Sequence, residues 1–86
     1  MSNELSFNGI NLETPATYRI QVQGHLDENW SDSLNNMVIT RAFTKKNKPI
    51  TILVGHLVDQ AALSGVLNSL YELHMPLLSA EVMNEI

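Results

Sequence analysis

The chain has 86 residues and a mass of 9.6 kDa, which suffices for one small domain and is too little for two. Hydrophobic residues make up 44% and charged residues 16%, which is typical of a globular domain, and the lack of cysteine excludes a disulfide framework and a thiolate zinc site. A net charge of −4 disfavours a general nucleic-acid binder, and no apolar run approaches the roughly 18 residues of a membrane span.

Residues 1–16 lack the positive start and the continuous apolar core of a secretory signal, so we expect a cytoplasmic protein. Their content of Asn, Ser, Gly and Pro predicts a flexible tail. An alternative follows from the apolar spacing, with Leu5 two residues before Phe7 and Ile10 two before Leu12. With that spacing the tail could lie as an edge strand on this copy or a neighbouring one.

The first predicted strand begins at Thr17. Tyr18, Ile20 and Val22 alternate with polar residues, which is typical of a strand with one buried face. Gly24 is expected to end this strand.

A short helix is predicted next. The Asp27 carboxylate can cap its first turn, and the helix should continue through Trp30 to Leu34. Asn35 and Asn36 tolerate left-handed geometry and should end it.

Two further strands are predicted over residues 37–43 and 50–54, joined by a short polar turn into an antiparallel hairpin. The run Ile50–Val54 is apolar at nearly every position, which favours a central strand. Gly55 is expected to close it.

The strongest helical stripe follows, from an Asp59 cap to about His74. Apolar residues recur there at helical spacing: Leu63, Val66, Leu67, Leu70 and Leu73. We attribute Gly65, inside this helix, to the close approach of another backbone. Pro76 blocks continuation.

The last strand is predicted over residues 77–83. Strict alternation would place Leu78, Ala80 and Val82 together on one face.

A weak repeat links the two halves of the chain. Gly24-His25-Leu26 and Gly55-His56-Leu57 each follow a predicted strand and precede a predicted helix. We therefore predict an α+β domain over residues 17–86 with the ferredoxin-like split βαββαβ fold. It should have a four-stranded antiparallel sheet, a short first helix and a long second helix.

Two helices would cover one sheet face and leave the other open. The third strand places Leu53 opposite in phase to Ile52 and Val54, so some apolar surface should remain on the open face. A domain of this size gains only marginal stability alone, so we expect a homodimer that buries this second face.

Three histidines are the first candidates for chemistry. His25 and His56 follow adjacent antiparallel strands, so they should lie at opposite sheet edges and share no site. His74 returns toward the first edge, where His25, Asp27 and His74 could converge on a metal ion. We favour exposed or hydrogen-bonded histidines and predict no metal and no cofactor.

Trp30 either caps one end of the core or belongs to a binding surface. The lysine turn, formed by Lys45, Lys46 and Lys48, is either a solvated tip or a small anchor for an acidic partner or a phosphate. No aromatic residues interleave with these lysines, which argues against nucleic acid.

Catalytic motifs are absent from the sequence: there is no nucleophile elbow and no glycine-rich phosphate loop.

Three segments of the sequence resemble a family of short, uncharacterised bacterial proteins. The segments are Tyr18–Ser31, with the pattern Y-x-I-x-V-x-G-x-L-D-x-x-W-S, Leu53–Leu67, with G-x-L-x-D-Q-A-A-L-x-G, and Pro76–Ser79. The resemblance implies a bacterial, cytoplasmic, non-enzymatic protein, and it assigns no partner. Asn35 and Asn36 stand where members of that family have glycines.

The sequence therefore favours a non-enzymatic, homo-oligomeric domain that acts by binding another protein or a small molecule. Its contact surface is expected at the segments 24–30 and 55–60, with these candidate residues: His25, Asp27, Trp30, His56, Asp59, Gln60 and His74. The rival hypotheses are a small dimeric ferredoxin-like enzyme and a ligand-sensing regulatory domain, each with a pocket between helix and sheet.

Overall fold

A computed structural model describes residues 14–83 of the chain. They form one four-stranded antiparallel sheet and two helices, which confirms the predicted α+β class. The elements in chain order are strand β1 (Ala16–Gln23), helix η1 (Glu28–Leu34), strands β2 (Val38–Phe43) and β3 (Pro49–Leu57), helix α1 (Gln60–Glu72) and strand β4 (Leu77–Met83).

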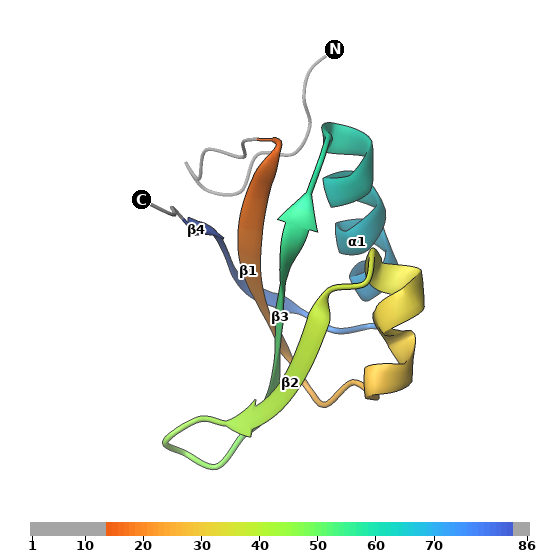
Figure 1. The fold of residues 1–86 in the computed structure, drawn as a ribbon. Coiled ribbons are helices and arrows are strands. Elements are labelled where there is room, and N and C mark those ends of the chain that lie inside the picture. Colours follow the sequence, from red (N-terminus) through yellow and green to blue (C-terminus); the bar gives the residue numbers. More distant parts are fainter. Residues whose placement is uncertain (1–13, 84–86) are drawn as a thin grey trace.

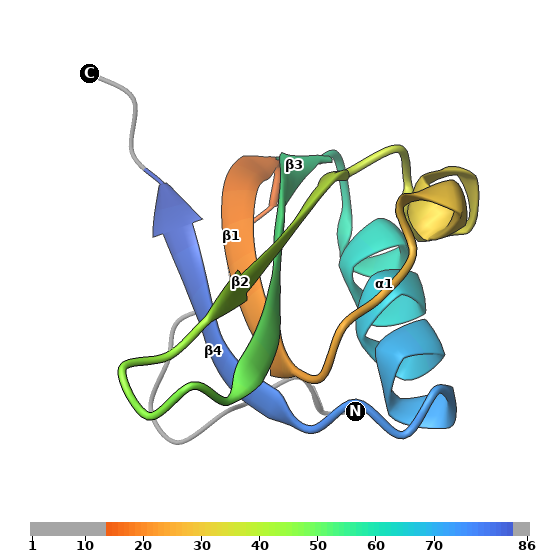
Figure 2. The same ribbon diagram turned by 90° about the horizontal axis from the view of Figure 1, so that it is seen from below.

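The strand order across the sheet is β2-β3-β1-β4 (Figure 1). Strand β1 pairs antiparallel with both β3 and β4, and β2 pairs antiparallel with β3. The run that was predicted to be central is therefore flanked on both sides. Figure 2, a view along the sheet, shows both helices on the same face. We call the opposite face, which no described helix covers, the uncovered sheet face.

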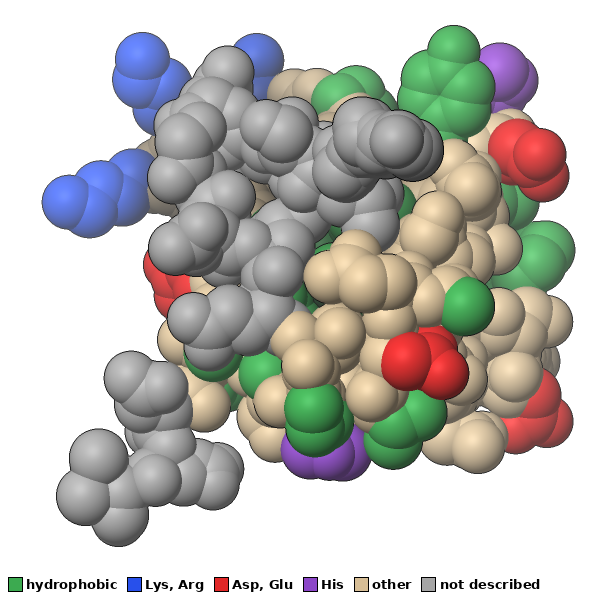
Figure 3. All heavy atoms as spheres, turned by 90° about the horizontal axis from the view of Figure 1, so that it is seen from above, with side chains coloured by type: hydrophobic (Ala, Val, Ile, Leu, Met, Phe, Trp, Pro, Cys, Tyr) green, Lys and Arg blue, Asp and Glu red, His purple; other side chains and the backbone are tan. Residues whose placement is uncertain are grey.

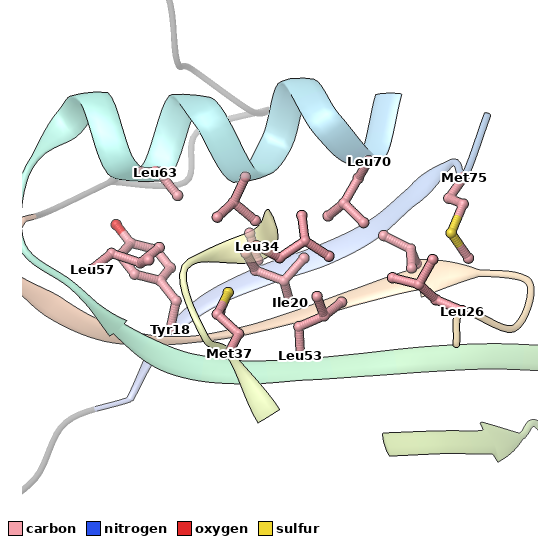
Figure 4. Close-up of a cluster of buried hydrophobic side chains, with 13 residues drawn as sticks. Tyr18, Ile20, Leu26, Leu34, Met37, Leu53, Leu57, Leu63, Leu70 and Met75 are labelled. Atoms are coloured by element: carbon pink, nitrogen blue, oxygen red, sulfur yellow. The ribbon is translucent and has the colours of Figure 1, made fainter. Parts of the chain in front are cut away.

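The core lies between α1 and the sheet (Figure 4). The alternation in β1 is confirmed, because Tyr18, Ile20 and Val22 are all fully buried. The predicted helical stripe is confirmed as well, with its buried positions being Leu63, Val66 and Leu70. The period of two in β1 and the helical spacing in α1 each place the apolar side chains on the side that faces the core.

The first helix is a 3-10 helix of seven residues, whereas α1 has thirteen. Its predicted cap is present, since the Asp27 carboxylate accepts a hydrogen bond from the Asn29 backbone N–H at 3.0 Å. Asn35 and Asn36 both have φ of 58°, so these asparagines adopt the left-handed conformation that glycine favours.

The prediction that Gly55 ends the third strand is wrong. Strand β3 continues to Leu57, and Gly55 lies opposite Tyr18 inside the ladder. A Cβ at residue 55 would lie 2.8 Å from the Met37 Cγ, so this glycine accommodates a neighbouring chain segment. Gly55-His56-Leu57 therefore belongs to a strand, and the two repeat copies do not occupy equivalent joints.

Strict alternation also fails in β4. The pairing register shifts at Val22, which lies opposite Leu77. As a result Leu77 packs against the core, while Leu78 is 50% exposed. A bulge of this kind adds one residue to a strand and reverses its facing pattern.

The interpretation of Gly65 is wrong within this chain. Among residues 14–83, no heavy atom of another segment lies within 4 Å of the position that its Cβ would occupy.

Candidate functional site

The structure places His25 and His56 at opposite ends of β1. His56 belongs to β3 and lies opposite Thr17, with its Nδ1 3.4 Å from the Thr17 hydroxyl. His25 follows the other end of β1, and its Nε2 lies 3.0 Å from the Ala42 carbonyl oxygen. Its ring meets the Phe43 ring edge-on, with centroids 4.9 Å apart. Both histidines therefore have structural contacts.

The two candidate aspartates cap helices. Asp59 accepts a hydrogen bond from the Ala62 backbone N–H at 2.8 Å, as Asp27 does from Asn29. Gln60 is the first residue of α1, directly after its cap. These contacts satisfy backbone donors that a helix start leaves free, so they explain both aspartates without a ligand.

Trp30 lies in η1 and is 40% exposed. Its indole is outside the main buried cluster, so a large apolar surface remains accessible on this helix.

His74 follows α1 in a left-handed conformation, with φ of 60°. The hypothesis that His25, Asp27 and His74 converge on a metal is not supported. Over residues 14–83, no three His, Cys, Asp or Glu side chains lie close enough to hold an ion.

The two joint segments of the predicted contact surface start far apart. Gly24 donates to the Pro49 carbonyl at one end of β3, and Gly55 lies six residues further along that strand. At about 3.3 Å per residue, the separation is roughly 20 Å.

The uncovered sheet face has an apolar half and a polar half. Cross-strand partners share a face, and Leu53 is buried against the helices, so its strand neighbours project to the other side. The apolar half comprises Val38, Ala42, Ile50, Ile52 and Val54, with Thr40 between the two β2 residues and with Ile50 only 9% exposed. Val38 is 65% exposed.

The polar half lies on β1 and β4. Arg19 stands opposite Glu81, and their side chains form an ion pair at 3.5 Å. Gln21 and Ser79 form the next pair of this half. The buried Ser79 hydroxyl has no hydrogen-bond partner among the described residues. The apolar half on β2 and β3 thus lies beside an ion pair whose two charges neutralise each other.

A concave surface runs between α1 and β4. It is an apolar groove of about 250 Å³ whose lining includes Leu67, Leu70, Tyr71, Met75, Pro76 and Leu77. Tyr71, Met75 and Pro76 also line a wider neighbouring hollow of about 620 Å³, whose lining includes Glu72 and His74.

Sequence reasoning missed two of the exposed large hydrophobic residues. Tyr71 is 80% exposed and Phe43 is 60% exposed, although both lie within predicted elements. Tyr71 follows the buried Leu70 on α1, so its position outside the helical stripe was the available signal.

Comparison with known proteins identifies a family. Residues 17–81 match a family described as a domain of unknown function (DUF8691). Neither the search of curated proteins nor the search of solved structures found a match for this chain. No helix in the described part of the chain is long and apolar enough to cross a membrane. Since the match covers most of the sequence, this chain belongs to the DUF8691 family.

Proposed function

We propose that this chain is a non-enzymatic binding domain that works as a homo-oligomer, with two copies in contact through their uncovered sheet faces. The observation that carries the proposal is the apolar half of that face, on β2 and β3. We also assign the fold to the ferredoxin-like class. The order β2-β3-β1-β4 supports this, as does the greater length of the second helix.

A second copy is the occupant that the face favours. A two-fold axis brings the same patch of both subunits together, so the apolar half of one can cover the apolar half of the other. Arg19 and Glu81, 37% and 55% exposed, then lie where they can pair within or between subunits. Their proximity means that dimerisation leaves no unpaired charge against an apolar surface.

The small size of the domain supports self-association further. A domain of this length buries a modest share of its surface alone, and covering a second sheet face adds apolar burial. The cytoplasmic location and the bacterial origin stay predictions from the sequence.

The test is the solution mass of a matched pair of variants. Val38→Glu puts a charge on the uncovered sheet face, and Val58→Glu puts the same charge on a residue outside it. The two valines are 65% and 62% exposed, so neither substitution removes a core contact. Light scattering coupled to size-exclusion chromatography should give about twice 9.6 kDa for the wild type and for Val58→Glu, and 9.6 kDa for Val38→Glu.

Two results would contradict self-association through this face. The wild type could have a mass of 9.6 kDa across a concentration series that reaches several hundred micromolar. Alternatively, both variants could remain dimeric, which would place the interface elsewhere.

A second candidate function is a ligand-sensing domain, favoured by the apolar groove between α1 and β4. Such a site is concave and mostly apolar with a few polar groups at its rim, as Asn68 and Tyr71 are here. A fluorescent apolar probe such as anilinonaphthalene sulfonate should lose binding on Leu67→Lys and keep it on Val38→Lys. The opposite result would place the probe on the uncovered sheet face and leave the groove without support.

A further inference from the structure

The charges of this chain are unevenly distributed, and the β2–β3 hairpin carries most of the positive ones. Arg41, Lys45, Lys46 and Lys48 are four of the five basic residues, and we call them the basic hairpin. The 23 residues from Asn36 to Val58 contain no Asp or Glu. Since the whole chain has a net charge of −4, the part outside these four residues has a net charge of −8. In Figure 3 the blue side chains gather at the upper left, and most visible red ones lie on the other side.

The turn that carries the lysines is held by its own hydrogen bonds. The Thr44 backbone N–H donates to the Lys48 carbonyl at 2.9 Å, and the Asn47 N–H donates to the Thr44 carbonyl at 2.8 Å. The Lys48 N–H donates to the Thr44 hydroxyl at 3.1 Å, and Asn47 has φ of 65°. These local bonds hold the backbone that carries the lysines in a defined conformation.

No described carboxylate neutralises the basic hairpin. Over residues 14–83 the ion pair that forms is Arg19–Glu81, on the other half of the sheet. Within the described part of the chain, the four cations therefore have no carboxylate partner and can pair with an external anionic group.

The outer edge of β2 is a second feature of the same hairpin. β2 is the last strand on its side of the described sheet, and its pairing with β3 is regular, without a bulge or a proline inside β2. The Thr44 N–H donates to the Lys48 carbonyl across the hairpin, and hydrogen-bonded pairs alternate with non-hydrogen-bonded pairs along an antiparallel ladder. Counted from Thr44, the β2 residues in non-hydrogen-bonded pairs with β3 are Phe43, Arg41 and Ile39. Their backbone N–H and C=O groups therefore point away from β3. Natural sheets commonly protect such an edge with bulges, prolines or charges, and β4, at the opposite side of the sheet, carries a bulge.

The two faces of β2 differ in chemistry. Arg41 and Phe43 project to the helix side, and Phe43, at 60% exposure, is held by the edge-on His25 ring. Val38 and Ala42 project to the uncovered sheet face. A strand added beside β2 would thus meet Arg41 and Phe43 on one face, and Val38 and Ala42 with Thr40 between them on the other.

We propose that β2 binds an extended acidic segment of another protein by strand addition. Acidic side chains of that segment face Arg41 and the lysine turn, and its apolar side chains extend the stripe formed by Val38 and Ala42. The backbone donors and acceptors of the edge favour a peptide over a nucleic acid, which could use the cations alone. The proposal is independent of self-association, because contact between sheet faces leaves the edge of β2 free.

The test uses a fluorescein-labelled peptide of seven residues, Glu-Val-Glu-Val-Glu-Val-Glu, and measures its anisotropy on titration with the full chain. A second peptide has proline in place of the central valine, and a third has lysine in place of every glutamate. We expect binding of the first, at least about fivefold weaker binding of the proline peptide, which lacks a central donor, and none of the lysine peptide.

Two variants that change the net charge by the same amount complete the test. Arg41→Gln should weaken binding of the first peptide about fivefold to tenfold, and Val58→Glu, just after the end of β3 opposite the lysine turn, should leave it unchanged. Equal binding of the glutamate and proline peptides would overturn strand addition, as would unchanged binding by Arg41→Gln. Tighter binding of an oligothymidine than of any peptide would overturn the choice of partner. Loss of a wild-type dimer in Arg41→Gln alone would show that the edge joins copies of this chain.

Discussion

A Cβ at residue 55 would lie 2.8 Å from the Cγ and 3.1 Å from the Cα of Met37, so Gly55 and Met37 touch through backbone as well as side chain. Met37 is fully buried and directly precedes β2, and Gly55 lies inside β3. This contact determines how closely the segment between η1 and β2 approaches β3. It therefore positions the start of β2, the edge strand that we propose as a binding site.

Gly55→Ala should destabilise the fold. The added methyl would have to displace the Met37 backbone, and overpacking of this kind costs about 1–3 kcal/mol. Gly65→Ala is the matched control, since nothing lies within 4 Å of its Cβ position and alanine favours a helix by roughly 0.5–1 kcal/mol. Urea denaturation followed by circular dichroism should move the two midpoints in opposite directions. A neutral Gly55→Ala would mean that the Met37 segment can move without cost.

Thr51→Val should cost about 1–3 kcal/mol, because Thr51 is fully buried and bridges the start of the β1–η1 connection. Its hydroxyl donates to the Gly24 carbonyl at 2.7 Å and accepts from the Leu26 N–H at 3.0 Å. Valine keeps the shape and leaves both backbone groups without their partner. Thr40→Val, on the exposed edge strand, should change the free energy of unfolding by less than about 0.5 kcal/mol. Equal midpoints for the two variants would show that water replaces the Thr51 hydroxyl.

Asp59→Ala should lower the stability by about 0.5–2 kcal/mol, since the Ala62 N–H at the start of α1 loses its acceptor. Asp59→Ser, which keeps a capping oxygen, should restore most of this loss in thermal denaturation. If alanine and serine behave alike, capping is not the role of Asp59, and its place in a binding surface gains weight.

His74→Gly should raise the stability by roughly 1 kcal/mol, because His74 has φ of 60° and glycine adopts this conformation without strain. For a domain of this size the melting temperature should rise by about 4–8 °C. His74→Ala keeps the unfavourable backbone conformation and should bring no gain. A lower melting temperature for His74→Gly would instead reveal a stabilising contact of the imidazole.

The sequence by itself determined the local structure of this protein. The period of Tyr18, Ile20 and Val22, the helical stripe of α1 and the two aspartate caps depend on residues within about one turn or two strand positions. These features do not depend on which distant segment each element packs against, so they could be predicted from the sequence. The same holds for Asn35 and Asn36 at the end of η1.

Only the tertiary structure decided where β3 ends, which leucine of β4 faces the core, and that the basic hairpin contains the edge strand of the described sheet. Gly55 continues a strand because Tyr18 pairs with it, and Leu77 replaces Leu78 in the core because the register shifts opposite Val22. Each of these features depends on cross-strand partners many positions away in the chain. Local periodicity does not contain those partners, and a one-residue change in register moves every following side chain to the other face.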